Sequence, residues 1–190
     1  MAVDARLFVI FFLSLPPPNE GVYWSRFIEF ILDPFVGFPA SLLNIGQVTK
    51  AQNNLGANYY HGRGVKQDYK EALKWYRLAA EQGFAAGQDN LGASYYHGHG
   101  VKQDYKKAVK WFRLAAEQGF FLAQNNLGLM YATGQGITQD MVQAHKWFNL
   151  AAINGHPQAA RNRGTAETNM TPSQIAKAQK LAKEWMEKQK

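Results

Sequence analysis

The feature that most constrains the fold of this chain is a 36-residue unit that occurs three times in succession. Residues 51–86 and 87–122 differ at nine positions, which leaves 27 identities in 36, and residues 123–158 keep the same spacing with more changes. Leucine, glycine, tyrosine and tryptophan recur in register, for example as Trp75 and Trp111. A fixed period of this length predicts stacked units that bury their apolar faces against one another.

Each unit reads as two helices joined by a glycine-containing turn. Apolar residues recur at i, i+4 and i+8 from Ala51, which predicts a first helix that begins near that residue. Asp68 and Glu71 have the spacing of an N-terminal capping box, which Asp140 and the glutamine three residues later repeat in the third unit. Gly83 has the position of a residue that ends a second helix. Nothing in the three units reads as a strand, so the expected class is all-α.

The turn of the second unit holds two histidines between glycines, and this raises the question of a metal site. His97 and His99 correspond to His61 and Arg63 in the first unit, and the third unit has no histidine at either position. The glycines recur in all three copies, while the imidazoles do not. Two histidines also fall short of a metal ligand set. The sequence therefore favours a helix-ending turn, and neither a metal nor another cofactor is expected.

The pattern begins Ala-Gln-Asn-Asn-Leu-Gly and continues through Tyr, Gly-x-Gly-Val, Asp-Tyr, Trp-Tyr and Ala-Ala to a final Gly. It closely resembles the Sel1-like repeat family, an α/α solenoid related to tetratricopeptide repeats. The resemblance covers residues 51–158. It implies a right-handed α/α solenoid of three helix-turn-helix repeats, and a non-catalytic adaptor that holds a protein or peptide on its concave face. Some cysteine-rich members were linked to β-lactam binding or hydrolysis. This chain has no cysteine, so a secreted hydrolase of that type is the less favoured alternative.

The segment after the repeats is expected to cap the solenoid. A fourth unit starts at Ala159, but its frame fails because Arg163 stands where leucine is expected. Thr171, followed by proline and by Gln174, then begins a helix with a capping box. Residues 159–190 are therefore interpreted as a partial repeat followed by a capping helix with a polar outer face.

Residues 1–50 differ in composition from the rest of the chain. They carry three basic and four acidic side chains, whereas residues 51–190 carry 18 basic and 10 acidic ones. An apolar run at residues 7–15 has the length of a signal-peptide core but lacks a typical cleavage site. Residues 20–32 have an amphipathic helical pattern, which favours a helix covering the first repeat over a membrane anchor. The compartment stays open between export and the cytoplasm.

Two surfaces are expected to meet partners. The first lies on the outward part of each first helix, where amides and tyrosines suit an extended peptide backbone. The residues expected there are Asn53, Tyr60, Asp89, Tyr96 and Asn125.

The second surface is a basic ladder on and before the second helices, which would suit an acidic partner or an anionic surface. Its residues are Lys66, Lys70, Lys74 and Arg77 in the first unit and Lys102, Lys106, Lys110 and Arg113 in the second. A solvated face explains the same charges. No nucleic-acid motif accompanies them, any membrane contact is expected through residues 1–50, and a monomer is expected.

No arrangement of nucleophile, base and orienting carboxylate stands out, so no catalytic residue is expected. His145 replaces Leu73 of the first unit and Val109 of the second. At an apolar helical position it is interpreted as a packing histidine and not as a base.

Overall fold

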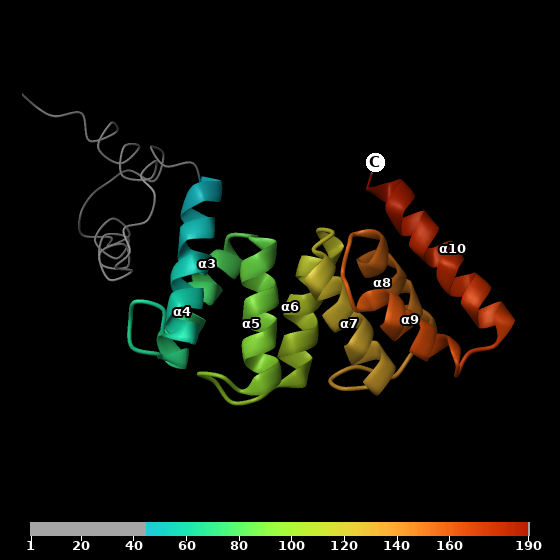
Figure 1. The fold of residues 1–190 in the computed structure, drawn as a ribbon, viewed down its shortest axis with the longest axis horizontal. Coiled ribbons are helices and arrows are strands. Elements are labelled where there is room, and N and C mark those ends of the chain that lie inside the picture. The colour runs from blue at the N-terminus through green and yellow to red at the C-terminus, as the bar shows by residue number, and fades with distance from the viewer. Residues whose placement is uncertain (1–44, 190) are drawn as a thin grey trace, which may run out of the picture.

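The computed structural model describes residues 45–189, and the regular structure of this part is entirely helical. The helices follow one another in a row from α3 at one end to α10 at the other (Figure 1). Consecutive helices pack against each other from α3 to α9, and α10 packs on α8. This confirms the all-α solenoid. The helices are α3 (Ile45–His61), α4 (Tyr69–Glu81), α5 (Ala85–His97), α6 (Tyr105–Glu117), α7 (Phe121–Thr133), α8 (Met141–Ile153), α9 (Ala159–Glu167) and α10 (Pro172–Lys188).

The first helix of each pair (α3, α5 and α7) is called an A helix below, and the second (α4, α6 and α8) a B helix. The prediction that the first A helix begins near Ala51 was wrong, because α3 begins at Ile45. No proline interrupts the chain between these residues, and Thr49 is buried with its hydroxyl donating to the Gly46 carbonyl. The periodic apolar stripe therefore marks the buried part of α3 and not its start.

The two helices of a pair approach closely because the A helix has a glycine where the B helix presents an aromatic ring. A methyl group built on Gly92 would lie 2.8 Å from the Phe112 ring, and one built on Gly128 would lie 2.6 Å from the Phe148 ring. Both rings are buried. The recurrent glycine thus provides the space for a large apolar side chain of the partner helix.

The Gly-x-Gly turn uses its two glycines for different purposes. Gly98 ends α5 with a φ of 75°, in the left-handed region that closes a helix. The second glycine, Gly100, has a φ of 73°, and a methyl group on it would lie 2.2 Å from the Tyr69 carbonyl oxygen. Gly136 meets the carbonyl of Tyr105 in the same way. The second glycine therefore lets the second and third turns touch the start of the preceding B helix.

The N-terminal caps of the B helices are present, but the predicted boxes are only half formed. The Asp68 carboxylate accepts hydrogen bonds from the backbone amides of Lys70 and Glu71. Glu71 does not return a bond to the cap, since its carboxylate pairs with Lys74 instead. Asp140 likewise accepts from the backbone amide three residues later. The complete box is at Thr171, where α10 begins.

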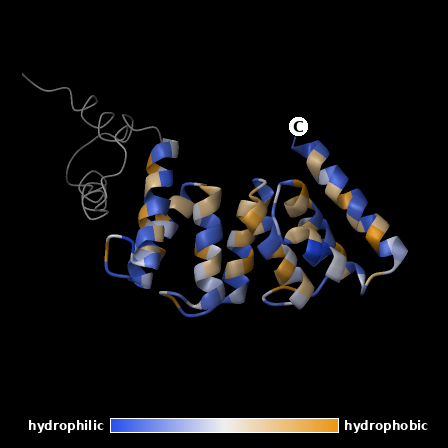
Figure 2. Cartoon of the chain, in the orientation of Figure 1, coloured by the Kyte–Doolittle hydropathy of each residue, from blue (hydrophilic) through white to orange (hydrophobic). Residues whose placement is uncertain are grey.

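The C-terminal helix caps the row by packing on the last B helix. Trp185 of α10 meets Trp147 of α8 edge to face at 6.0 Å between ring centroids, and Ala178 and Ala182 are buried. Hydrophobic and hydrophilic residues interleave along α10 (Figure 2), as expected of an amphipathic helix. Trp147 is buried in the core, while the equivalent Trp75 and Trp111 are half-buried because no such helix covers them.

The predictions for residues 7–15 and 20–32 lie outside the described residues. Among residues 45–189, no helix is both long enough and apolar enough to cross a membrane.

Candidate functional site

The A helices are joined by one side-chain hydrogen bond per repeat boundary, here called the amide ladder. In each bond, the side-chain amide of an asparagine on α5, α7 or α9 donates to a side-chain oxygen on the preceding A helix. The donor and the acceptor are 37 residues apart, so the acceptor stands one position before the residue that is equivalent to the donor. The pairs are Asn90 to Asn53 at 2.8 Å, Asn126 to Asp89 at 3.0 Å and Asn162 to Asn125 at 2.8 Å.

This ladder changes the interpretation of three predicted partner-binding residues. Asp89 is 7% exposed and Asn125 is 6% exposed, so the expectation that both face solvent was wrong. Asn53 is half-buried. Their polar groups hold neighbouring repeats together. A helical wheel places a residue on a face of its own helix, but it does not indicate where the next repeat lies.

The other two predicted residues, Tyr60 and Tyr96, also contact the next repeat. The Tyr60 hydroxyl lies 2.9 Å from His99 Nδ1, and the Tyr96 hydroxyl donates to Gln135 Oε1 at 3.2 Å. His99 and Gln135 are the middle residues of successive Gly-x-Gly turns. Both tyrosine rings stay half-buried, so each retains an accessible part beside the turn.

The histidine pair of the second turn is part of a stack of rings. His99 stacks on Tyr69 at 4.7 Å between centroids and on His97 at 5.3 Å. Two parallel imidazoles present their faces to each other, whereas metal ligands must converge on one ion. Within residues 45–189, no group of three or more His, Asp or Glu side chains could hold a metal ion.

The histidine stack predicts a loss of stability on mild acidification. Partial burial and the neighbouring His99 lower the pKa of His97 below its ordinary value of 6.5. The unfolded chain then takes up the proton first, so stability falls as the pH drops below about 6.5. His99→Gln, which copies Gln135 of the third repeat, should reduce this loss. Urea unfolding of both proteins at pH 7.5 and pH 5.0 measures it, and an equal loss in the two proteins would contradict the prediction.

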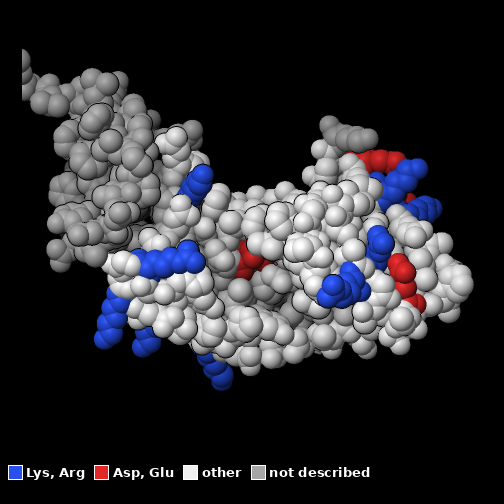
Figure 3. All heavy atoms as spheres, in the orientation of Figure 1, with Lys and Arg blue, Asp and Glu red and all other residues white. Residues whose placement is uncertain are grey.

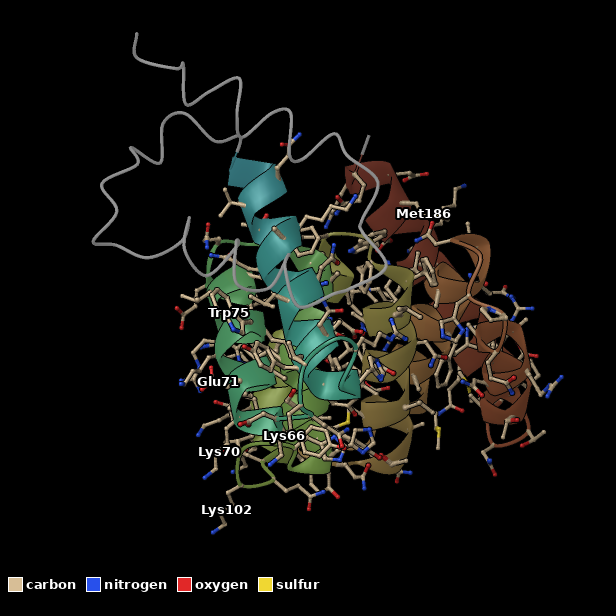
Figure 4. All side chains as sticks on the ribbon, turned by 60° about the vertical axis from the view of Figure 1, so that its left-hand side comes forward. Lys66, Lys70, Glu71, Trp75, Lys102 and Met186 are labelled. Carbon is tan, nitrogen blue, oxygen red and sulfur yellow. The ribbon has the colours of Figure 1, made fainter. Side chains whose placement is uncertain are left out.

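The basic ladder is partly engaged within the fold. Arg77 donates to the Tyr95 hydroxyl at 3.2 Å, and Arg113 donates to the Tyr131 hydroxyl at 3.1 Å, so both arginines join a B helix to the following A helix. Lys110 lies over the Trp111 ring. The remaining ladder lysines are exposed, and one of them, Lys74, pairs with Glu71. Among them, Lys70 and Lys102 project away from the helices at the turn end of the molecule (Figure 4).

At the last repeat boundary, between α8 and α9, a polar cluster takes the place of the hydrogen bond between arginine and tyrosine. His145 is fully buried, and its Nε2 lies 2.7 Å from Glu167 Oε1. Arg163 approaches the same carboxylate and donates to Asn149. His145 Nδ1 has no partner among the described residues. The packing interpretation of His145 therefore holds for its position, although only one nitrogen is satisfied.

Comparisons with known proteins agree with this geometry. The Sel1 repeat family matches residues 49–84, 85–120 and 122–156, one or two residues earlier than the frame inferred from the repeats. No curated protein matches the chain.

Two solved structures are similar. The first is c5321, a protective antigen present in uropathogenic Escherichia coli strains that displays an SLR fold. It has 34% identity and a TM-score of 0.69, over 87% of this chain and 37% of that one. The second is a Sel1 repeat protein from Oxalobacter formigenes, with 32% identity and a TM-score of 0.63, over 76% of this chain and 56% of that one. This chain therefore spans only about a third to a half of the length of these relatives. From the three matched repeats and the stacked helix pairs, we conclude that the chain belongs to the Sel1 repeat family.

Proposed function

We propose that this protein is a non-catalytic scaffold that binds a protein or peptide across its A helices. Sel1 repeat proteins are generally protein-interaction scaffolds. The observation that carries the proposal is the exposure of apolar side chains on the last A helix, where Leu122 and Leu129 are 39% and 40% exposed. Stacked repeats present such positions as one extended surface, which suits an elongated partner.

The half-buried tyrosines extend this surface toward the turns. Tyr60 and Tyr96 hold their hydroxyls on neighbouring turns, so their rings are fixed before a partner arrives. A fixed ring contributes contact area with little further loss of conformational entropy. A partner that crosses several repeats would therefore meet leucines at one end and tyrosine rings at the other.

Affinity capture with the immobilised full chain tests this proposal. The native host's lysate is applied, and the resin is washed at low and then at high salt. A protein partner held by apolar contacts should remain at high salt, because salt screens exposed ionic contacts. The double variant Tyr60→Ala/Tyr96→Ala should weaken its retention while leaving the helical content unchanged.

A matched variant separates the rings from their hydroxyls. Tyr60→Phe/Tyr96→Phe keeps the rings and removes the hydrogen bonds to the next turns, so it should retain the partner. If the alanine variant retains the partner as well as the original chain does, these tyrosines are not part of the binding surface. If no protein is retained by any form, the scaffold proposal fails.

A further inference from the structure

Asp89 is a buried carboxylate on α5. One of its oxygens accepts a hydrogen bond from Asn126, and no ion pair within the described residues includes it. Burial raises the pKa of this carboxyl to about 6. A buried charge without a partner of opposite sign is unfavourable. Its presence is therefore not explained by the stability of the fold.

The amide ladder does not require this charge. Asn53 and Asn125 occupy the equivalent positions in the other two repeats and accept the same hydrogen bond with a neutral amide. Asparagine and aspartate have nearly the same shape, so an asparagine at position 89 would complete the ladder equally well. The carboxylate supplies a negative charge at a point where the fold needs only an acceptor.

The position of this charge on the surface follows from its bond to α7. Asn126 lies four residues after Leu122 and three residues before Leu129, and positions with this spacing share one face of a helix. The Asp89 carboxylate is thus held beside α7 between two exposed leucines, which are separated along the helix axis by about 10 Å. On its own helix, the residues one turn away are the half-buried alanines Ala86 and Ala93, and 7% of Asp89 remains exposed beside them.

No basic side chain of the described residues forms an ion pair with the Asp89 carboxylate. The basic ladder lies on the B helices and the turns that precede them, and its arginines face the tyrosines of the following A helix. Figure 3 shows one recessed patch of acidic atoms in the middle of this face, while other acidic atoms lie among basic ones at the end of the molecule that carries α10. A cationic side chain that reaches Asp89 would therefore meet a negative charge set in a mostly apolar surface.

From this arrangement we propose that Asp89, Leu122 and Leu129 form a subsite for a partner segment that places a lysine or arginine between two apolar side chains. The cation meets the Asp89 carboxylate, and the two apolar side chains rest on the leucines. The inference rests on the proposed scaffold function and names the chemistry of the bound segment. On α5 the equivalent positions hold Ala86 and Ala93 in place of the leucines, so we assign the subsite to the boundary between α5 and α7.

Selection from a library of random twelve-residue displayed peptides tests the subsite with the full chain as bait. Peptides enriched by the original protein should carry lysine or arginine flanked by apolar residues. The Asp89→Asn variant should lose the preference for the basic residue, and Leu122→Ala/Leu129→Ala should lose the preference for its apolar neighbours. Both variants use residues that the chain itself has at equivalent positions, so they should fold normally, as circular dichroism would verify.

A double-mutant cycle on one enriched peptide makes the test quantitative. Replacing its basic residue by norleucine, or Asp89 by asparagine, should each weaken binding by about tenfold or more, because a charge-assisted hydrogen bond is lost. Making both changes should weaken binding no further than either change alone. Independent, additive effects of the two changes would overturn the assignment of Asp89 to the cation.

The outcomes separate this inference from the proposed function. Enriched peptides without a basic residue, or an unchanged preference in Asp89→Asn, would overturn the subsite. If a lysate partner is nevertheless retained at high salt and lost in the tyrosine variant, the scaffold function stands without the subsite. If the library yields no enriched peptide, the subsite is rejected, and the capture experiment alone decides the scaffold function.

Discussion

Replacing Gly100 by alanine should destabilise the protein by about 3 to 4 kcal/mol, because two penalties coincide at this position. Its φ of 73° lies in the left-handed region, which a side chain disfavours. The added methyl group would also lie 2.2 Å from the Tyr69 carbonyl oxygen. Backbone at the start of α4 cannot rotate away as a flexible side chain would. The turn and the preceding repeat must therefore separate, which urea unfolding monitored by circular dichroism would measure.

Gly119 provides the matched control for this prediction. Its φ is 85°, and no heavy atom lies within 4 Å of an added methyl group. Gly119→Ala should therefore cost only the conformational penalty, about 1 to 2 kcal/mol. Gly136→Ala should behave like Gly100→Ala, since its methyl group would meet the Tyr105 carbonyl. Equal losses in Gly100→Ala and Gly119→Ala would show that the contact between the turn and the preceding helix is unimportant.

Replacing Asp89 by asparagine should stabilise the protein by about 2 to 3 kcal/mol at neutral pH. Burial raises the pKa of this carboxyl from 3.8 to about 6, so the folded state disfavours the charged form. A raised carboxyl pKa means that folding is relatively favoured below pH 3.8 and that this contribution is lost as the pH rises through about 6. The gain in Asp89→Asn should therefore be full above pH 6 and should disappear near pH 4.

Urea unfolding at several pH values between 4 and 8 would measure this difference. The reverse change, Asn125→Asp, places a carboxylate at the equivalent buried position of the next repeat, and it should destabilise the protein above pH 6. If Asp89→Asn has the same stability as the original chain at pH 7.5, the carboxylate is better solvated than its burial indicates. The same result would weaken the argument that the Asp89 carboxylate binds a basic side chain of a partner.

The parts of the fold that could be predicted from the sequence are those fixed within one repeat. The helix-ending turn at Gly98 and the cap at Asp68 depend on residues a few positions apart. The close approach of the paired helices at Gly92 likewise follows from a motif inside the unit. Local chemistry determines these features, and a 36-residue period repeats them.

The parts that could not be predicted depend on how one repeat sits against the next. Asp89 and Asn125 were expected to face solvent, because a helical wheel does not show that an asparagine of the following helix covers them. The sequence assigns Arg77 to a basic ladder that is either a binding surface or a solvated face, although its guanidinium reaches a tyrosine 18 residues later. These contacts depend on the angle between neighbouring units, which no single unit specifies.

The candidate site was missed in part for the same reason. The sequence signal that could have revealed it is the replacement of asparagine by aspartate at position 89, between two copies that both have asparagine. The leucines at positions 122 and 129 add to that signal, since the chain has alanine 36 residues earlier at both positions, as Ala86 and Ala93. Their significance follows only from the bond between Asn126 and Asp89, which brings the charge to α7.

The polar cluster at the last boundary has a consequence for how such chains change length. The surface that an internal repeat presents to the next repeat matches the surface that it accepts from the previous one. Duplicating one 36-residue segment would therefore add a repeat whose two interfaces resemble those already present. At the end of the row, Arg163 and Glu167 stand where internal repeats have leucine and tyrosine. Their charges are held by His145 and Asn149. A repeat inserted at this boundary would lack these polar partners, so duplication fits the boundaries between the three repeats better than it fits this one.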